Sequence, residues 1–306
     1  MPLERYLAEL SDSNKRLALS KLANLSALSP EELDQFREVW ATMDAVRQRQ
    51  IITRLVELAE QNPILDFDDI FISCLSDHDS MVRTKAIDGL WECDKRSLID
   101  RFVNMVKTDS DESVRATAAT ALGRFVMLAE LGKLRSGDVE KVRNALFEII
   151  DSCTGVTDVA RRAVEAISPL TLPQVRALIE RAYGSDDGKM RVSAVFAMGR
   201  NSDPVWLPVL LKELANSDPE MRYEAAVACG ELGSEEAVPY LRSLVGDLDS
   251  QVRLSAVAAL GKIGGIEAEE TLRRCLGAAD EHVCEAAAEA LEELSFTKEP
   301  LSFGIQ

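Results

Sequence analysis

Polar and apolar residues recur along the chain in a fixed order that fits one face of a helix. An Asp is followed three residues later by Val or Met and then directly by Arg. Small or apolar residues, mostly Ala, follow four, seven and eight positions after the Val or Met, the spacing of one buried helical stripe. The opening Asp is a preferred N-cap residue. Clear copies start at Asp79, Asp111, Asp187, Asp218, Asp249 and Asp280.

Weaker copies extend the pattern to the rest of the chain. Arg16 and Val46-Arg47 fit the register, Ala160 replaces the arginine after Val159, and Cys284 replaces it in the last copy. The arginine positions are then 16, 47, 83, 115, 160, 191, 222, 253 and 284, with steps of 31, 36, 32, 45, 31, 31, 31 and 31 residues. Regular steps of this length are typical of repeat proteins.

Each repeat reads as two helices. Residues 204–215 carry an apolar stripe at helical spacing, and Asn216-Ser217 interrupts it. Asp218 and Pro219 suit the first positions of a second helix, and Gly233 suits its end. Ser29 with Glu32 predicts a capping box at another helix start.

A two-helix unit cannot bury its own apolar stripe, so neighbouring units must stack in series. The sequence therefore predicts an all-α protein with a single solenoid over residues 1–294, built from about nine helical hairpins. Small residues at 225 and 228 let adjacent helices approach closely. The hairpins are expected at 3–25, 31–61, 66–94, 97–127, 138–168, 172–200, 203–233, 235–264 and 267–294.

The repeat resembles HEAT repeats, in particular the short alanine-rich kind of the phycobilisome-lyase-like group. The resemblance rests on Val238-Pro-Tyr-Leu-Arg-Ser-Leu-Val and on Asp249-Ser-Gln-Val-Arg253 followed by Ala256 and Ala259-Leu-Gly-Lys-Ile-Gly264. It covers nearly the whole chain and implies a right-handed α-α superhelix of the HEAT or armadillo type. For function it is less specific, since the group includes scaffolds, lyases and regulators.

Two segments depart from the repeat. The 45-residue step holds an insert near residues 128–138, which is expected to form a loop or to lengthen a helix. Residues 295–306 lack helical periodicity and are expected to form a C-terminal tail with four apolar residues, Phe296, Leu301, Phe303 and Ile305.

The charge balance argues against nucleic acid and membrane partners. The chain has 35 Lys and Arg against 52 Asp and Glu, a net charge of −17. Such a surface repels phosphate backbones and anionic lipid headgroups. Residues 203–306 hold 8 basic and 20 acidic groups, so the excess lies mainly in this part. It favours solubility and can steer a basic partner.

The six cysteines are scattered without a C-x-x-C pair, which fits a reducing cytoplasm. The N-terminus has no apolar signal core, and no run of about 18 apolar residues predicts a membrane span. A cytoplasmic location is expected.

Candidate catalytic chemistry is sparse. The two histidines, His78 and His282, lie in the turns before the Val-Arg step and read as surface residues. His282 with Cys275 and Cys284 falls short of the four ligands of a structural zinc site. No His-Glu dipeptide, P-loop, nucleophile elbow or G-x-G-x-x-G occurs. We expect no cofactor, no metal and no enzymatic activity.

The recurring Asp and Arg are best read as structural. Asp caps the second helix, while Arg can bond to a carboxylate of the adjoining repeat. The predicted inter-repeat ladder involves Arg83, Arg115, Arg191, Arg222 and Arg253.

A partner surface is predicted on the second helices. On a helical wheel, the positions two and six residues after the Val or Met point away from the buried stripe. In three consecutive repeats they supply Val192 and Phe196, Tyr223 and Val227, and Leu254 and Ala258, with Arg200, Glu231 and Lys262 as a charged margin. Flanking repeats carry polar residues there, such as Thr84, Asp88, Thr120, Glu285 and Glu289. An apolar patch with a polar rim is typical of protein docking, although lateral packing between second helices would use similar residues.

The sequence therefore favours a non-enzymatic scaffold that binds a protein or peptide, including a basic one, on the concave side that second helices line in HEAT-like solenoids. The alternative, implied by the resemblance alone, is a lyase or chaperone-like accessory of a chromophore or cofactor protein.

Overall fold

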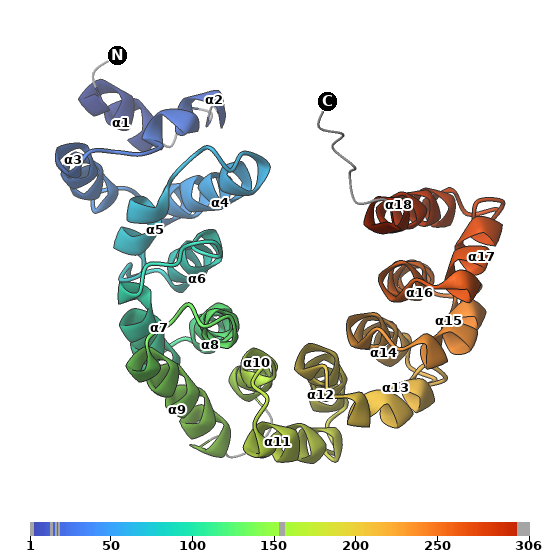
Figure 1. Ribbon diagram of the computed structural model, residues 1–306. Coiled ribbons are helices and arrows are strands. Elements are labelled where there is room, and N and C mark those ends of the chain that lie inside the picture. Colours follow the sequence, from blue (N-terminus) through green and yellow to red (C-terminus); the bar gives the residue numbers. More distant parts are fainter. Residues whose placement is uncertain (1–2, 13–14, 16, 18, 153–156, 299–306) are drawn as a thin grey trace, which may run out of the picture. The chain divides into compact units, whose positions relative to one another are not determined.

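The computed structural model describes residues 3–12, 15, 17, 19–152 and 157–298, without the side chains of 19–20 and 296–298. This described part is built from α-helices and short 3-10 helices and contains no strand. The chain divides into two compact units, Met1–Ala166 and Ile167–Gln306. Both are stacks of helical hairpins, so the predicted α-solenoid is confirmed (Figure 1).

In unit 1 the first helices of successive hairpins pack on one another, and so do the second helices. Two layers result, with the apolar stripes buried between them. The elements are α1 (Leu3–Ser11), α2 (Leu19–Leu22), η1 (Ala23–Leu25), α3 (Pro30–Trp40), α4 (Ala45–Gln61), α5 (Asp68–Cys74), α6 (Ser80–Gly89), α7 (Ser97–Thr108), α8 (Glu112–Glu130), α9 (Ser136–Ser152) and α10 (Asp158–Ile167), whose last residue belongs to unit 2.

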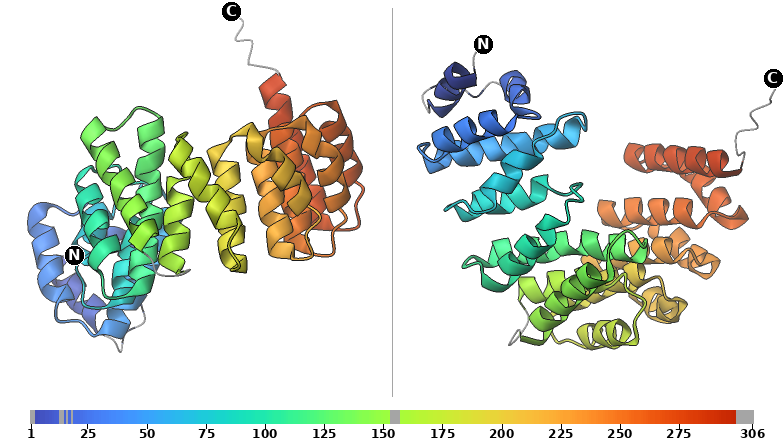
Figure 2. Two further views of the ribbon diagram at one scale, coloured as in Figure 1. Left: turned by 90° about the horizontal axis from the view of Figure 1, so that it is seen from below. Right: turned by 60° about the vertical axis from the view of Figure 1, so that its left-hand side comes forward.

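Unit 2 repeats the same arrangement more regularly. Figure 2 shows its helices, yellow to red, side by side in a stack. Within this unit the second helices α12, α14, α16 and α18 form one row and the first helices the other. Its elements are α11 (Pro173–Tyr183), α12 (Gly188–Asn201), η2 (Pro204–Trp206), α13 (Leu207–Glu213), α14 (Pro219–Leu232), η3 (Glu235–Ala237), α15 (Val238–Leu244), α16 (Ser250–Ile263), α17 (Ile266–Cys275) and α18 (Glu281–Lys298).

Helix ends form where the sequence predicts them. Asp218 caps α14 by accepting a hydrogen bond from the Glu220 amide, and Pro219 is the first helical residue. Gly233 ends this helix with φ of 68°, a left-handed conformation that glycine adopts without steric cost. Ser29 and Glu32 form the predicted capping box of α3. Asp79, Asp111, Asp187 and Asp249 cap their second helices in the same way.

The second helices of unit 2 approach so closely that only glycine fits at the crossing points. A Cβ atom added to Gly199 would lie 2.7 Å from the Ala228 Cα of the next second helix. At Gly230 it would lie 2.9 Å from the Ala259 Cα, and at Gly261 it would lie 2.8 Å from the Ala290 Cβ. Successive repeats therefore meet through glycine on one helix and alanine on the next.

The predicted arginine ladder is confirmed at three positions. Arg83 binds both carboxylate oxygens of Asp109 at 2.9 and 2.7 Å, and Arg222 binds both oxygens of Asp247 at 2.8 Å. Arg253 binds Asp280 in the next turn at 2.6 Å. Each of these arginines also donates to two backbone carbonyls of its own turn, so one side chain joins two repeats.

The other two predicted ladder arginines bind backbone carbonyls. Arg191 donates to the carbonyls of Ser185 and Asp186, each at 3.0 Å. Asp247 is the acidic acceptor of Arg222. The equivalent residue for Arg191, one repeat earlier, is Asn216, which carries no negative charge. Arg115 donates to the carbonyl of Asp109 at 2.7 Å.

The ladder keeps its carboxylates ionised. Hydrogen bonds from Arg222 hold the pKa of Asp247 below its usual value, with burial acting in the opposite direction. The pKa of Asp280 is lowered in the same way by Arg253. A lowered pKa in the folded state means that this stabilisation is fully present above the usual carboxyl pKa of about 4 and is lost as the pH falls below it.

The predicted register of the second hairpin is wrong. Val46 is 61% exposed, whereas Arg47 is buried with 4% of its surface exposed. Asp44 caps α4 and places Arg47, not Val46, three residues after the cap. Burial of Arg47 is tolerated because its Nε donates to the carbonyl of Leu10 at 2.7 Å. Arg16, the marker of the first repeat, lies outside the described residues.

The insert near residues 128–138 lengthens two helices, and only a short connection remains. Helix α8 has 19 residues and ends at Glu130, and α9 has 17 residues and begins at Ser136. The expected tail is also partly helical, because α18 continues to Lys298. Leu301, Phe303 and Ile305, and the side chain of Phe296, lie outside the described part.

We expect Gly199→Ala to lower the free energy of unfolding by about 1–3 kcal/mol, the usual cost of overpacking. Gly246→Ala is the matched control, because the nearest atom to its added Cβ lies 4.0 Å away, and a change within about 0.5 kcal/mol is expected. Urea unfolding followed by circular dichroism measures both. Equal stability of the two variants would show that the helices separate without cost.

Candidate functional site

The predicted docking residues lie on three neighbouring second helices. Phe196 on α12, Tyr223 and Val227 on α14, and Leu254 on α16 are half-buried, and Ala258 on α16 is exposed. Directly behind them, Ala194, Ala225 and Ala256 are completely buried. We call the surface formed by Phe196, Tyr223, Val227, Leu254 and Ala258 the second-helix face of unit 2.

Val192 does not belong to this face. Only 5% of its surface is exposed, and it continues a run of buried residues from Val192 to Val195. Helix α12 is thus buried over a wider arc than α14 or α16, where the corresponding residues, Tyr223 and Leu254, stay half-buried. The prediction that Val192 lines the docking surface is therefore wrong.

The predicted charged margin comes together as an ion-pair row. Lys262 Nζ on α16 lies 2.5 Å from a carboxylate oxygen of Glu231 on α14, and Arg200 on α12 lies 4.0 Å from the other oxygen. Glu231 thus bridges two cations from the neighbouring repeats. Because all three side chains are partly exposed, the row contributes little to stability.

At α18 the row of apolar residues gives way to acidic ones. Glu285 and Glu289 occupy the positions equivalent to Leu254 and Ala258, and both are exposed. Glu281, Glu292 and Glu293 lie on the same helix, which has no Lys or Arg between 281 and 295. The C-terminal side of the second-helix face is therefore strongly acidic.

The corresponding positions in unit 1 are polar, except for Ala116 on α8. Thr84 and Asp88 on α6 are half-buried, and Thr120 on α8 is exposed. A carboxylate oxygen of Asp88 lies 2.9 Å from Lys85 Nζ of the same helix. On α10, a carboxylate oxygen of Glu165 lies 2.7 Å from the Arg162 guanidinium. Large apolar side chains at these positions are therefore a feature of unit 2.

The described residues hold no arrangement typical of metal binding or thiol chemistry. No group of three or more His, Cys, Asp or Glu side chains among them could hold a metal ion. His78 is exposed in its turn, as expected, whereas His282 is exposed but is the second residue of α18. Burial raises the pKa of the Cys74 and Cys229 thiols to about 12, so both stay protonated at neutral pH and are poor nucleophiles. Cys153 lies outside the described part.

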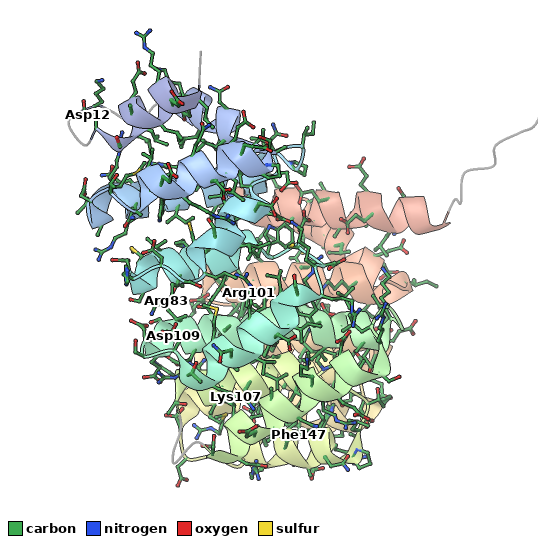
Figure 3. All side chains as sticks on the ribbon, turned by 90° about the vertical axis from the view of Figure 1, so that its left-hand side faces the viewer. Asp12, Arg83, Arg101, Lys107, Asp109 and Phe147 are labelled. Carbon is green, nitrogen blue, oxygen red and sulfur yellow. The ribbon has the colours of Figure 1, made fainter. Side chains whose placement is uncertain are left out.

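Sequence reasoning missed a surface depression of about 560 Å³ in unit 1, between the α5–α6 turn and α7. Figure 3 shows Arg83 and Asp109 next to each other on this side, with Arg101 nearby. Arg83 and Asp109 satisfy each other, and Arg101 donates to the carbonyl of Ile72 at 3.1 Å. The depression is open and polar, and its charges serve mainly to join repeats.

In the part of the chain that the structure describes, no helix combines the length and the hydrophobicity of a membrane-spanning segment.

Comparisons with known proteins agree with this architecture. The model of HEAT repeats matches residues 69–168 and 175–260, and the PBS lyase HEAT-like repeat matches residues 252–278. No curated protein matches the chain significantly.

Two solved structures illustrate the likeness. The CpcE–CpcF complex of phycocyanin lyase from Nostoc sp. PCC7120 is 16% identical, over 92% of this chain and 97% of that one, with a TM-score of 0.54. Human deoxyhypusine hydroxylase in complex with glycerol is 18% identical over 96% and 97% of the two chains, with a TM-score of 0.39. At 16% identity, the likeness to the CpcE–CpcF complex concerns the fold alone.

Because Val192 is buried and Tyr223 is half-buried, introducing a charge at the two positions should lower the stability of the protein by different amounts. Val192→Asp should destabilise the protein by about 3 kcal/mol or more, because it buries an unpaired carboxylate. Tyr223→Asp should cost about 1 kcal/mol, since the new side chain can reach water. Thermal unfolding followed by circular dichroism compares them, and a larger loss for Tyr223→Asp would mean that Tyr223 is part of the core.

Proposed function

We propose, since the chain belongs to the HEAT-repeat family, that it is a non-enzymatic scaffold and that a protein or peptide binds on its second-helix face of unit 2. The observation that carries this proposal is the row of half-buried apolar side chains that crosses three repeats. We place the protein in the cytoplasm, where its cysteines would remain reduced.

The face has the composition of a docking surface. Phe196 and Tyr223 are aromatic, and aromatic residues are enriched among those that dominate binding energies. They are held by rigid helices with buried alanines behind them, so little side-chain or backbone ordering would accompany binding. The row of Arg200, Glu231 and Lys262 supplies the polar rim.

Lateral packing between second helices is the competing role for these side chains. The closest approach between neighbouring second helices occurs at glycine and alanine, at Gly199 with Ala228 and at Gly230 with Ala259. The aromatic and branched residues keep exposed surface beside these contacts. A partner would cover that surface and gain hydrophobic stabilisation at about 25 cal/mol per Å² buried.

The acidic side of the face favours a basic partner. A segment lying across α14, α16 and α18 would meet Tyr223 and Leu254 first and then Glu285 and Glu289. Apolar residues followed by Lys or Arg would complement this order. The net charge of −17 would also speed the approach of such a partner at low ionic strength.

A second candidate function is that of an accessory to a chromophore- or cofactor-carrying protein. It is favoured by the match of residues 252–278 to the PBS lyase HEAT-like repeat and by the fold shared with the CpcE–CpcF complex of phycocyanin lyase. It differs from a plain scaffold in requiring that the bound partner carry a prosthetic group, which absorption spectra of the captured partner would reveal.

The test is affinity capture from the native host with the wild type, the double variant Phe196→Asp/Tyr223→Asp, and the control Tyr240→Asp. Tyr240 is 48% exposed but lies on α15, a first helix, so its change alters the other layer. We expect the wild type and the control to recover the same partner and the double variant to recover about tenfold less or none, as for loss of an interface hot spot.

Equal recovery by all three proteins would contradict the proposed face, provided that circular dichroism shows the double variant to be folded. Recovery that falls with added salt would support a basic partner, and recovery that does not change with salt would favour an apolar one.

A further inference from the structure

A small cavity lies at the N-terminal end of unit 1, between α1 and α4. It has a volume of about 60 Å³, and the side chains around it include Tyr6 and Glu9 of α1, Lys15, Lys21 of α2 and Arg47 of α4. A single water needs about 10–15 Å³, so the cavity has room for several waters or for one small oxyanion.

The Tyr6 hydroxyl is buried in this place without a partner. Tyr6 is only 4% exposed, and its oxygen has no hydrogen-bond partner among the described residues. Buried hydroxyl groups normally have one, and an exception requires an explanation such as a bound water or ion. Burial raises the pKa of Tyr6 to about 12, with the Arg47 charge acting in the opposite direction, so the hydroxyl keeps its proton and can donate.

Arg47 is a second buried group that is only partly satisfied. It is 4% exposed, and its guanidinium donates to the Leu10 carbonyl at 2.7 Å and to Gln50 Oε1 at 3.4 Å. Both acceptors are neutral. Arg83, Arg222 and Arg253 each hold a carboxylate, whereas Arg47 forms no ion pair with a described residue. A buried cation without an anion is unfavourable, and a bound anion would correct this.

The remaining charges around the cavity are mostly positive. Lys21 Nζ lies 3.1 Å from Glu9, and Lys15 Nζ lies 3.5 Å from Asp12 at the end of α1. The lining residues Arg47, Lys15 and Lys21 oppose the single carboxylate of Glu9. With Asp12 counted, three cationic and two anionic side chains lie around the cavity, a small positive excess in a chain with a net charge of −17.

We infer that this cavity binds a small oxyanion, and that a phosphate group is its ligand. The Tyr6 hydroxyl and the free guanidinium N–H groups of Arg47 would donate to the phosphate oxygens. The Arg47 charge would be the main partner of the anion, since Lys15 and Lys21 already pair with Asp12 and Glu9. Such a group would join α1 to α4, the first and second hairpins of unit 1. The site is distinct from the second-helix face of unit 2.

The experiment measures phosphate binding to the full chain by isothermal titration calorimetry and by thermal unfolding, with chloride at equal ionic strength and with acetate as comparisons. We expect the wild type to bind phosphate and to unfold at a higher temperature in its presence than in either comparison. Tyr6→Phe should bind phosphate about tenfold more weakly, the loss of one hydrogen bond to a charged group. Tyr240→Phe, on the other layer of unit 2, should bind as the wild type does.

The stability of Tyr6→Phe without phosphate separates weaker phosphate binding from a general loss of folding. Without phosphate, Tyr6→Phe should be at least as stable as the wild type, because it removes an unsatisfied buried hydroxyl. Phosphate should raise the unfolding temperature of the wild type by more than it raises that of Tyr6→Phe. Equal phosphate dependence in the two proteins, or none in either, would overturn the inference, and the second result would mean that water alone fills the cavity.

A further arm identifies the source of the phosphate group. Glycerol phosphate that binds more tightly than inorganic phosphate would assign the site to a phosphate monoester. Tighter binding of inorganic phosphate would assign it to the free ion.

Discussion

The close approach of neighbouring second helices is the constraint on which the rest of unit 2 depends. Gly199, Gly230 and Gly261 each face an alanine of the next second helix at a distance that leaves no room for another Cβ. This contact is possible only because each repeat places glycine and alanine at the same helical positions. It forces every larger side chain either into the layer between first and second helices or onto the outer surface of the second helices, which is where Phe196 and Tyr223 lie.

The turns that precede the second helices form a second set of contacts between repeats. There the linkage is electrostatic, because one arginine binds its own turn and an aspartate of the next. The glycine contacts set how near the helices lie, while the arginines fix the orientation of the turns. Neither interaction uses the second-helix face of unit 2, so its apolar residues keep exposed surface. In unit 1, two of the equivalent positions hold acidic residues, Asp88 and Glu165, that pair within their own helix.

Most of the fold was predictable because each repeat encodes its own helix ends. Asp218, Pro219 and Gly233 act locally, so their roles follow from the sequence alone. The ladder was predictable for Arg222 and not for Arg191, since the outcome depends on one residue of the following repeat. The predicted register at Val46 was wrong because Arg47 occupies the buried position. A hydrophobic pattern does not identify a buried arginine. The predicted exposure of Val192 was wrong because the width of the buried face of each helix depends on the helices packed against it. The cavity at Tyr6 was not predicted, because its lining combines Arg47 of the second hairpin with first-hairpin residues that share no recognisable motif.

The central claim is that repeats of unit 2 are ordered by contacts with their neighbours, so that adjacent second helices cannot open independently. Native-state hydrogen exchange of the α14 and α16 backbone amides under increasing urea tests it most directly. The account predicts that the two helices share one opening free energy and one urea dependence, since Gly230 and Ala259 couple them. Distinct opening free energies, with α14 still protected after α16 has exchanged, would contradict it.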